Sequence, residues 1–132
     1  MARVLVIDDD PSQARQVALA LQVEGIDSCV ACGAGEAFAA LEASPVEMVL
    51  LELMLPGTNG LDLARQVHER FPEVRIVLTG AYHLSERQLL RSDCGAMAFV
   101  PKPFEARAVA GFLRSKMPAP PPSVRRLCPT GS

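Results

Sequence analysis

The hydrophobic positions of the chain follow two alternating patterns, one typical of buried strands and one typical of helices. Residues 3–7 are mostly β-branched and apolar without polar alternation, as expected for a strand buried on both faces of a parallel sheet. Asp10 and Pro11 then form a helix start, and apolar residues recur at helical spacing until Gly25 ends the helix. The beginning of the chain therefore predicts a strand followed by a helix.

The same unit of strand and helix recurs four more times. The further strands are expected at residues 26–31, 47–51, 75–78 and 96–100, and the further helices at 35–43, 60–71, 85–92 and 105–115. Strands that alternate with helices through short connections form a parallel sheet with right-handed crossovers and helices on both faces. The pattern therefore predicts an α/β fold of the doubly wound class, with a five-stranded parallel sheet and five helices.

The composition changes after the last helix. Residues 118–132 are rich in proline, which cannot continue a helix and favours extended polyproline geometry. We therefore expect one folded domain at residues 1–117, followed by a tail that serves as a linker or docking segment.

Bulk composition is that of an ordinary soluble domain. The chain has 132 residues, 49% of them hydrophobic and 21% charged. No apolar run approaches the ~18 residues of a membrane span, and the first residues lack the pattern of a signal peptide, so we expect a cytoplasmic protein without membrane partners. The net charge of -2 gives no reason to expect nucleic-acid binding through this domain. Cys29 and Cys32 would point to opposite faces of a strand, which disfavours a redox or metal pair.

Polar residues follow four of the five predicted strands. Asp8 and Asp9 follow the first strand, Glu52 the third, Thr79 the fourth and Lys102 the fifth. Functional groups of doubly wound folds gather beyond the carboxyl ends of the strands. Three carboxylates at one edge repel one another unless a divalent cation or an ammonium group neutralises them. Carboxylates suit Mg²⁺, whereas a hydroxyl and an ammonium suit a phosphoryl group, so the set predicts metal-assisted phosphoryl chemistry.

Four stretches carry a family resemblance that extends over residues 3–116. They are VLVIDDDP, LMLPGTNG, IVLTG and AFVPKPF. Together they resemble the receiver domain of two-component response regulators. The resemblance implies a flavodoxin-like, CheY-like sheet with strand order 2-1-3-4-5. It also implies that Asp8 and Asp9 bind Mg²⁺ with the backbone carbonyl of Met54.

The resemblance assigns roles to further residues. Thr79 corresponds to the hydroxyl residue that moves onto the phosphoryl group, and Phe99 to the aromatic switch residue. Lys102 corresponds to the lysine that pairs with phosphate, and the Lys102–Pro103 peptide bond is expected to be cis.

Glu52 departs from the family pattern, because it stands where an aspartate receives the phosphoryl group from a histidine kinase. One extra methylene moves the carboxylate by at most roughly 1.5 Å, and a misplacement of ~1 Å can cost about a hundredfold in rate. Glutamate carries one charge, whereas a phosphoryl group brings about -1.5 to -2. We therefore expect a degenerate receiver, whose conformation is set by Glu52 with Lys102 and Thr79. We expect this receiver to bind Mg²⁺ weakly. We expect it to be no enzyme and to act by protein–protein interaction.

Two other interpretations remain open from the residues alone. One is an ordinary Mg²⁺-dependent receiver of a histidine-kinase phosphorelay, whose acceptor aspartate has been engineered to a phosphomimetic glutamate. The other is a small phosphatase similar to haloacid dehalogenases, although the chain offers no later acidic pair and no cap insertion. For a receiver, the resemblance implies that a signalling partner binds the face between Ser85 and Ser115, and that a histidine kinase binds if the site is phosphorylatable.

Overall fold

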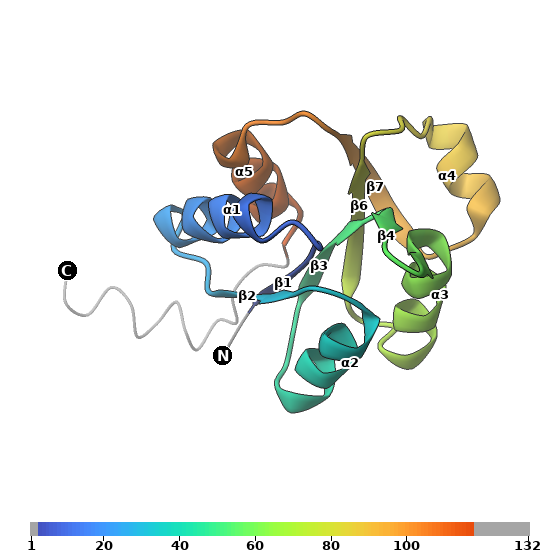
Figure 1. The fold of residues 1–132 in the computed structure, drawn as a ribbon, viewed down its shortest axis with the longest axis horizontal. Coiled ribbons are helices and arrows are strands. Elements are labelled where there is room, and N and C mark those ends of the chain that lie inside the picture. Colours follow the sequence, from blue (N-terminus) through green and yellow to red (C-terminus); the bar gives the residue numbers. More distant parts are fainter. Residues whose placement is uncertain (1–2, 118–132) are drawn as a thin grey trace.

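The computed structural model describes residues 3–117, which form a parallel sheet covered by helices on both faces (Figure 1). The sheet strands are β1 (Val4–Ile7), β2 (Ser28–Ala31), β3 (Met48–Glu52), β6 (Arg75–Gly80) and β7 (Ala96–Pro101). The helices are α1 (Pro11–Val23), α2 (Ala34–Ala43), α3 (Gly60–Arg70), α4 (Glu86–Ser92) and α5 (Ala106–Lys116). The strand order β2-β1-β3-β6-β7 confirms the predicted doubly wound sheet and its order 2-1-3-4-5.

The central strands divide the hydrophobic core into two layers. Successive side chains of a strand point to opposite faces of the sheet. Leu5 and Ile7 accordingly pack with residues of α2 and α3, whereas Val4 and Val6 pack with residues of α1 and α5. Figure 1 shows the two helix pairs on opposite sides of the sheet. Burial on both faces explains why β1 carries no polar alternation.

Side-chain caps fix the first turns of α1 and α3, which begin beside the carboxyl ends of the strands. Asp10 accepts hydrogen bonds from the backbone N–H groups of Ser12 and Gln13 at the start of α1, as the sequence predicts. Asn59 caps α3 in the same way. Such caps satisfy N–H groups that have no partner within the helix.

The strands extend further into the predicted site than the sequence pattern indicates. The strands expected to end at residues 51 and 78 continue to Glu52 and Gly80, and Glu52 lies opposite Thr79 in the ladder. The second strand begins at Ser28 rather than at residue 26. A short hairpin, β4 (Met54–Leu55) with β5 (Thr58–Asn59), was not predicted, because each strand has only two residues and shows no periodicity.

Two further predictions concern the tail and the membrane. The proline-rich tail, residues 118–132, lies outside the described residues. Within residues 3–117, every helix is too short or too polar to cross a membrane.

Candidate functional site

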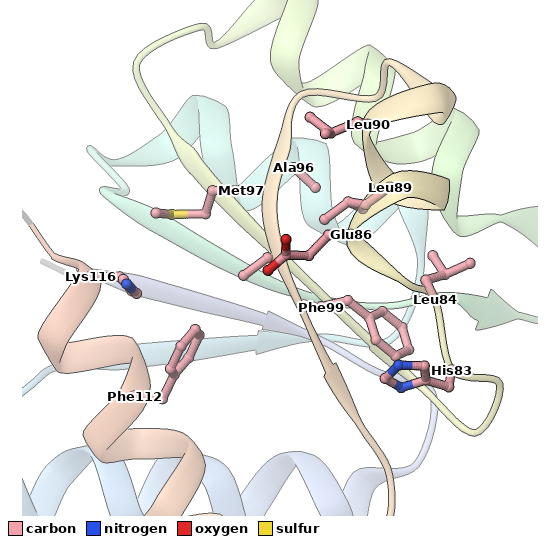
Figure 2. Close-up of a pocket in the computed structure, with 11 residues that line it drawn as sticks. His83, Leu84, Glu86, Leu89, Leu90, Ala96, Met97, Phe99, Phe112 and Lys116 are labelled. Atoms are coloured by element: carbon pink, nitrogen blue, oxygen red, sulfur yellow. The ribbon is translucent and has the colours of Figure 1, made fainter.

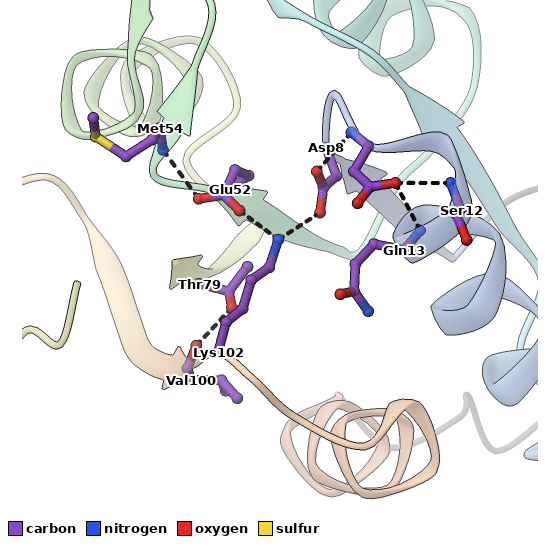
Figure 3. A network of polar contacts seen from close by, with 9 residues as sticks. Asp8, Ser12, Gln13, Glu52, Met54, Thr79, Val100 and Lys102 are labelled. Carbon is purple, nitrogen blue, oxygen red and sulfur yellow. Dashed lines mark hydrogen bonds and ion pairs between the residues drawn. The ribbon is translucent and has the colours of Figure 1, made fainter. Parts of the chain in front are cut away.

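Lys102 joins the ends of two central strands by bridging two buried carboxylates (Figure 3). Its Nζ donates to Asp8 Oδ2 at 3.0 Å and to Glu52 Oε1 at 2.5 Å. Asp8 is only 5% exposed and Glu52 only 6% exposed. The backbone holds the lysine in place, because its N–H donates to the carbonyl of Gly80 at 2.9 Å. The Lys102–Pro103 peptide bond is cis, the form expected there.

The remaining oxygens of the two carboxylates accept hydrogen bonds from the backbone. Asp8 Oδ1 accepts from the N–H of Asp10 at 2.9 Å, and Glu52 Oε2 accepts from the N–H of Met54 at 3.1 Å. Over residues 3–117, no buried side-chain nitrogen or oxygen lacks a hydrogen-bond partner. Each oxygen of the two carboxylates therefore has a hydrogen-bond donor within the chain.

Lys102 supplies the charge that makes two neighbouring buried carboxylates tolerable. Burial alone lowers the pKa of Lys102, but hydrogen bonds and Coulombic attraction from Glu52 and Asp8 outweigh burial and raise this pKa above its ordinary value. The lysine is thus protonated at neutral pH. Of the two neutralising groups that the sequence allowed, a divalent cation or this ammonium, the ammonium contacts both carboxylates.

Thr79 lies opposite Glu52 in the strand ladder but makes no hydrogen bond to it, and Phe99 lies away from the carboxylates, in β7. The Thr79 hydroxyl donates to the backbone carbonyl of Val100 at 2.6 Å. Phe99 packs against the core layer of α2 and α3. His83, which no sequence signal singled out, meets the Phe99 ring edge-on at a centroid distance of 5.9 Å.

The predicted metal ligands are only partly brought together. Asp8 belongs to the Lys102 network, whereas Asp9 is exposed beside it and Met54 begins the β4–β5 hairpin. Within the part of the chain that the structure describes, no three His, Cys, Asp or Glu side chains form a group that could hold a metal ion. The Mg²⁺ site expected from Asp8, Asp9 and the Met54 carbonyl stays a prediction, and Lys102 would compete with the ion for Asp8.

Gly80 is a site residue that the sequence analysis missed. A methyl group at position 80 would lie 3.1 Å from Glu52 Oε2 and 3.2 Å from Leu53 Cβ. Such contacts are tighter than van der Waals packing allows without a shift. The glycine in IVLTG was visible, but its relation to Glu52 depends on the pairing of β3 with β6.

Comparison with known proteins places the chain among receivers. The family described as the response regulator receiver domain matches residues 4–114. The chain therefore belongs to the family of response regulator receiver domains, which confirms the resemblance at this level. The family match does not support the phosphatase interpretation.

Curated relatives are about twice as long as the chain. The DNA-binding response regulator MtrA of Mycolicibacterium smegmatis is 36% identical over 115 residues, which cover 87% of the chain and 50% of MtrA. The sensory transduction protein RegX3 of the same organism is 32% identical over 115 residues, which cover 87% of the chain and 50% of RegX3. The chain thus spans about half the length of the relatives that it matches.

Solved structures agree with this fold. A CheY-like receiver domain protein from Methanospirillum hungatei superposes with a TM-score of 0.78 at 26% identity, covering 88% of the chain and 93% of that protein. The response regulator TrrA of Thermotoga maritima, solved in complex with Mg²⁺ and BeF, gives a TM-score of 0.74 at 27% identity over 87% of the chain and 98% of TrrA.

Proposed function

We propose that the chain is a degenerate receiver, in which the ion pair of Glu52 with Lys102 sets the conformation without phosphorylation. The observation that carries this proposal is the engagement of both Glu52 oxygens, one by the Lys102 ammonium and one by the Met54 N–H. Phosphoryl transfer needs an aligned nucleophilic oxygen in a near-attack geometry. A longer, buried carboxylate that is held by two donors is a poor nucleophile.

Gly80 supports a site that is adapted to glutamate. The missing side chain at position 80 leaves the space beside Glu52 Oε2 that a longer acid uses. An aspartate would withdraw its carboxylate from that space. The surroundings of Glu52 therefore favour a degenerate receiver over an ordinary receiver with an engineered acceptor.

We propose that the output of this cytoplasmic module is protein binding rather than catalysis or contact with nucleic acid. A groove of about 640 Å³ runs between α4, β7 and α5, and it overlaps the face predicted from Ser85 to Ser115 but also includes His83, Leu84 and Lys116 (Figure 2). Its rim exposes Leu90 by 81% and Met97 by 44%. Phe99 lines the groove and lies directly before Val100, which accepts the Thr79 hydrogen bond, so the site and this face are mechanically connected. A histidine kinase has no required role in this proposal.

Beryllofluoride with Mg²⁺ tests the proposed function. In saturating Mg²⁺, the amide NMR spectrum of the native chain should not change on addition of beryllofluoride, because donors hold both Glu52 oxygens away from the position of the phosphoryl analogue. Glu52→Gln should shift the amide signals of Thr79, Phe99 and Met97 without any ligand, because it weakens the pairing with Lys102. A ligand shifts an equilibrium only by its differential affinity for the two states. Saturable shifts of the native spectrum with beryllofluoride would contradict the proposal.

Mg²⁺ is proposed to bind weakly through Asp8 and Asp9, with the Met54 carbonyl as a further ligand. When bound, the ion would supply positive charge beside the acids. In a calorimetric titration, we expect an affinity that falls further in Asp9→Ala, because that variant removes a carboxylate that makes no contact with Lys102. Asp27→Ala, which removes an exposed acid elsewhere, is the matched control. An unchanged affinity in Asp9→Ala would exclude Asp9 from the site.

Gly80→Ala should lower the free energy of unfolding more in the native chain than in the Glu52→Asp variant. The added methyl would push Glu52 from its position, at a cost on the order of 0.5–1.5 kcal/mol for a displaced side-chain rotamer. Urea unfolding of the four combinations gives the coupling directly, since effects of alanine on backbone entropy cancel in the cycle. Equal effects in both backgrounds would show that Gly80 does not accommodate Glu52.

A further inference from the structure

A second apolar groove lies at the opposite edge of the sheet from the acidic site. It has a volume of about 340 Å³ and lies between the α2–β3 connection and the α3–β6 connection. Its apolar lining consists of Leu41, Pro45, Val46, Phe71, Pro72 and Val74. The function proposed above makes no use of this groove.

One side of the groove is held in place by Arg70, and an acidic residue, Glu73, lies on its rim. Arg70 pairs with Glu42, and its guanidinium lies 4.6 Å from the centre of the Phe38 ring and 5.6 Å from that of Phe71. These contacts fix the aromatic side of the groove and use the charge of Arg70. Glu73, on the rim, is exposed and makes no ion pair with any residue in the range 3–117.

The described chain ends at the same edge of the sheet as this groove, although α5 covers the opposite face. The Arg75 guanidinium donates to the backbone carbonyl of Lys116 at 2.5 Å, and Arg75 directly follows Val74 of the groove lining. The segment 118–132 therefore starts at the same edge of the sheet. At roughly 3.1 Å per residue in polyproline geometry, it can reach on the order of 40 Å. Its length is ample for the groove.

The chemistry of this segment complements the groove. Proline-rich chains in polyproline geometry bind grooves lined by aromatic residues, because little conformational entropy is lost on binding. Phe71 and the two prolines of the lining offer such a surface. The segment contains Arg125 and Arg126 and no acidic residue, whereas the rim presents Glu73.

We infer that residues 118–132 dock within the same chain into the groove formed by the α2–β3 and α3–β6 connections, with Arg125 and Arg126 beside Glu73. Covalent attachment gives the segment a millimolar effective concentration at the groove, so a weak intrinsic affinity suffices. A different groove along α1, which is lined by Leu19 and Asp27 among others, is more polar. This α1 groove is the rival surface for docking.

A spin label on Cys128 of the full chain tests the inference. The exposed Cys32 and half-buried Cys29 are replaced by serine, and Cys94 is shielded by burial. With the label oxidised, the amide NMR signals of Val46, Phe71 and Val74 should lose most of their intensity relative to the reduced sample. The signals of Leu19 and its neighbours on α1 should keep theirs.

Charge exchange separates this docking from chance contact. Glu73→Lys alone and Arg125→Glu with Arg126→Glu should each relieve the signal loss at the groove, and the combined variant should restore it. Asp27→Lys makes the same charge change in the rival groove and should have no effect. These substitutions are at exposed or tail positions, so the fold is retained.

Three outcomes would overturn the inference. They are an absence of signal loss at the groove, signal loss confined to α1 and relieved by Asp27→Lys, and equal signal loss when labelled chains are mixed with unlabelled, isotope-enriched chains. The last result would identify a second copy of the chain as the occupant.

Discussion

Incubation with acetyl phosphate and Mg²⁺ should leave the native chain unmodified, whereas Glu52→Asp should gain one phosphoryl group. In the native chain, the glutamate carboxylate is displaced from the position of an aspartate carboxylate by up to roughly 1.5 Å, the length of one C–C bond. Lys102 Nζ also holds Glu52 Oε1 at 2.5 Å. A shift of ~1 Å costs about a hundredfold in rate. Shortening the side chain withdraws the carboxylate and releases Lys102 to pair with the incoming phosphoryl oxygens.

Intact mass spectrometry measures this difference directly. Glu52→Asn provides the matched control, because asparagine has the size of aspartate but has no negatively charged oxygen to act as the nucleophile. Labelling of Glu52→Asp that is lost in alkali would identify an acyl phosphate. Stoichiometric, base-labile phosphate on the native chain would disprove the degenerate receiver, and a Glu52→Asp chain that remains unlabelled would show that the rest of the site is also inactive.

Removal of the bridging cation should have the largest effect on stability. Lys102→Met keeps the aliphatic stem but leaves Asp8 and Glu52 buried, adjacent and uncompensated. Removal of one partner of a buried ion pair typically costs about 3–5 kcal/mol. Because the lysine side chain is 18% exposed, water partly screens the site, and we expect a loss near the lower end of that range. Urea unfolding at neutral pH measures it.

Adding Glu52→Gln to Lys102→Met should recover part of the lost stability, because only one buried charge then remains. This recovery distinguishes an electrostatic cause from a packing defect, which the second substitution would not relieve. Arg114→Met, which removes an exposed ion pair with Glu24, should cost less than about 1 kcal/mol and serves as a control. A Lys102→Met chain that is as stable as the native chain would contradict the bridging role.

The pH dependence of this stabilisation follows from the raised pKa of Lys102. A lysine whose pKa is higher in the folded state binds its proton more tightly there, so its contribution is fully present below the unfolded value of about 10.4. The contribution is lost as the pH rises through the folded pKa. The native chain should therefore lose more stability than Lys102→Met above about pH 10.4, and the two should run in parallel near neutral pH.

The sequence by itself determined the architecture and which strands supply the site. Apolar runs such as residues 3–7 can be buried on both faces only in a helix-covered parallel sheet, and five of them separated by helical repeats leave one fold class. Because parallel strands share one carboxyl edge, the sequence alone assigns four polar residues to one site: Asp8, Glu52, Thr79 and Lys102. Local pattern was sufficient for these conclusions because each depends on the apolar residues within a single strand or helix and on the polar residue that follows a strand.

The tertiary structure alone decided which of these groups touch. The sequence left open whether a cation or Lys102 neutralises the acids, and the ammonium contacts both Asp8 and Glu52. Asp9, though adjacent to Asp8 in the chain, is turned to solvent, and Thr79 bonds Val100 instead of Glu52. The space that Gly80 leaves for Glu52 depends on the register of β3 with β6. Contacts between residues 21 or more apart, unlike strand periodicity, depend on distances between elements, and those are set only when the sheet and its helices pack together.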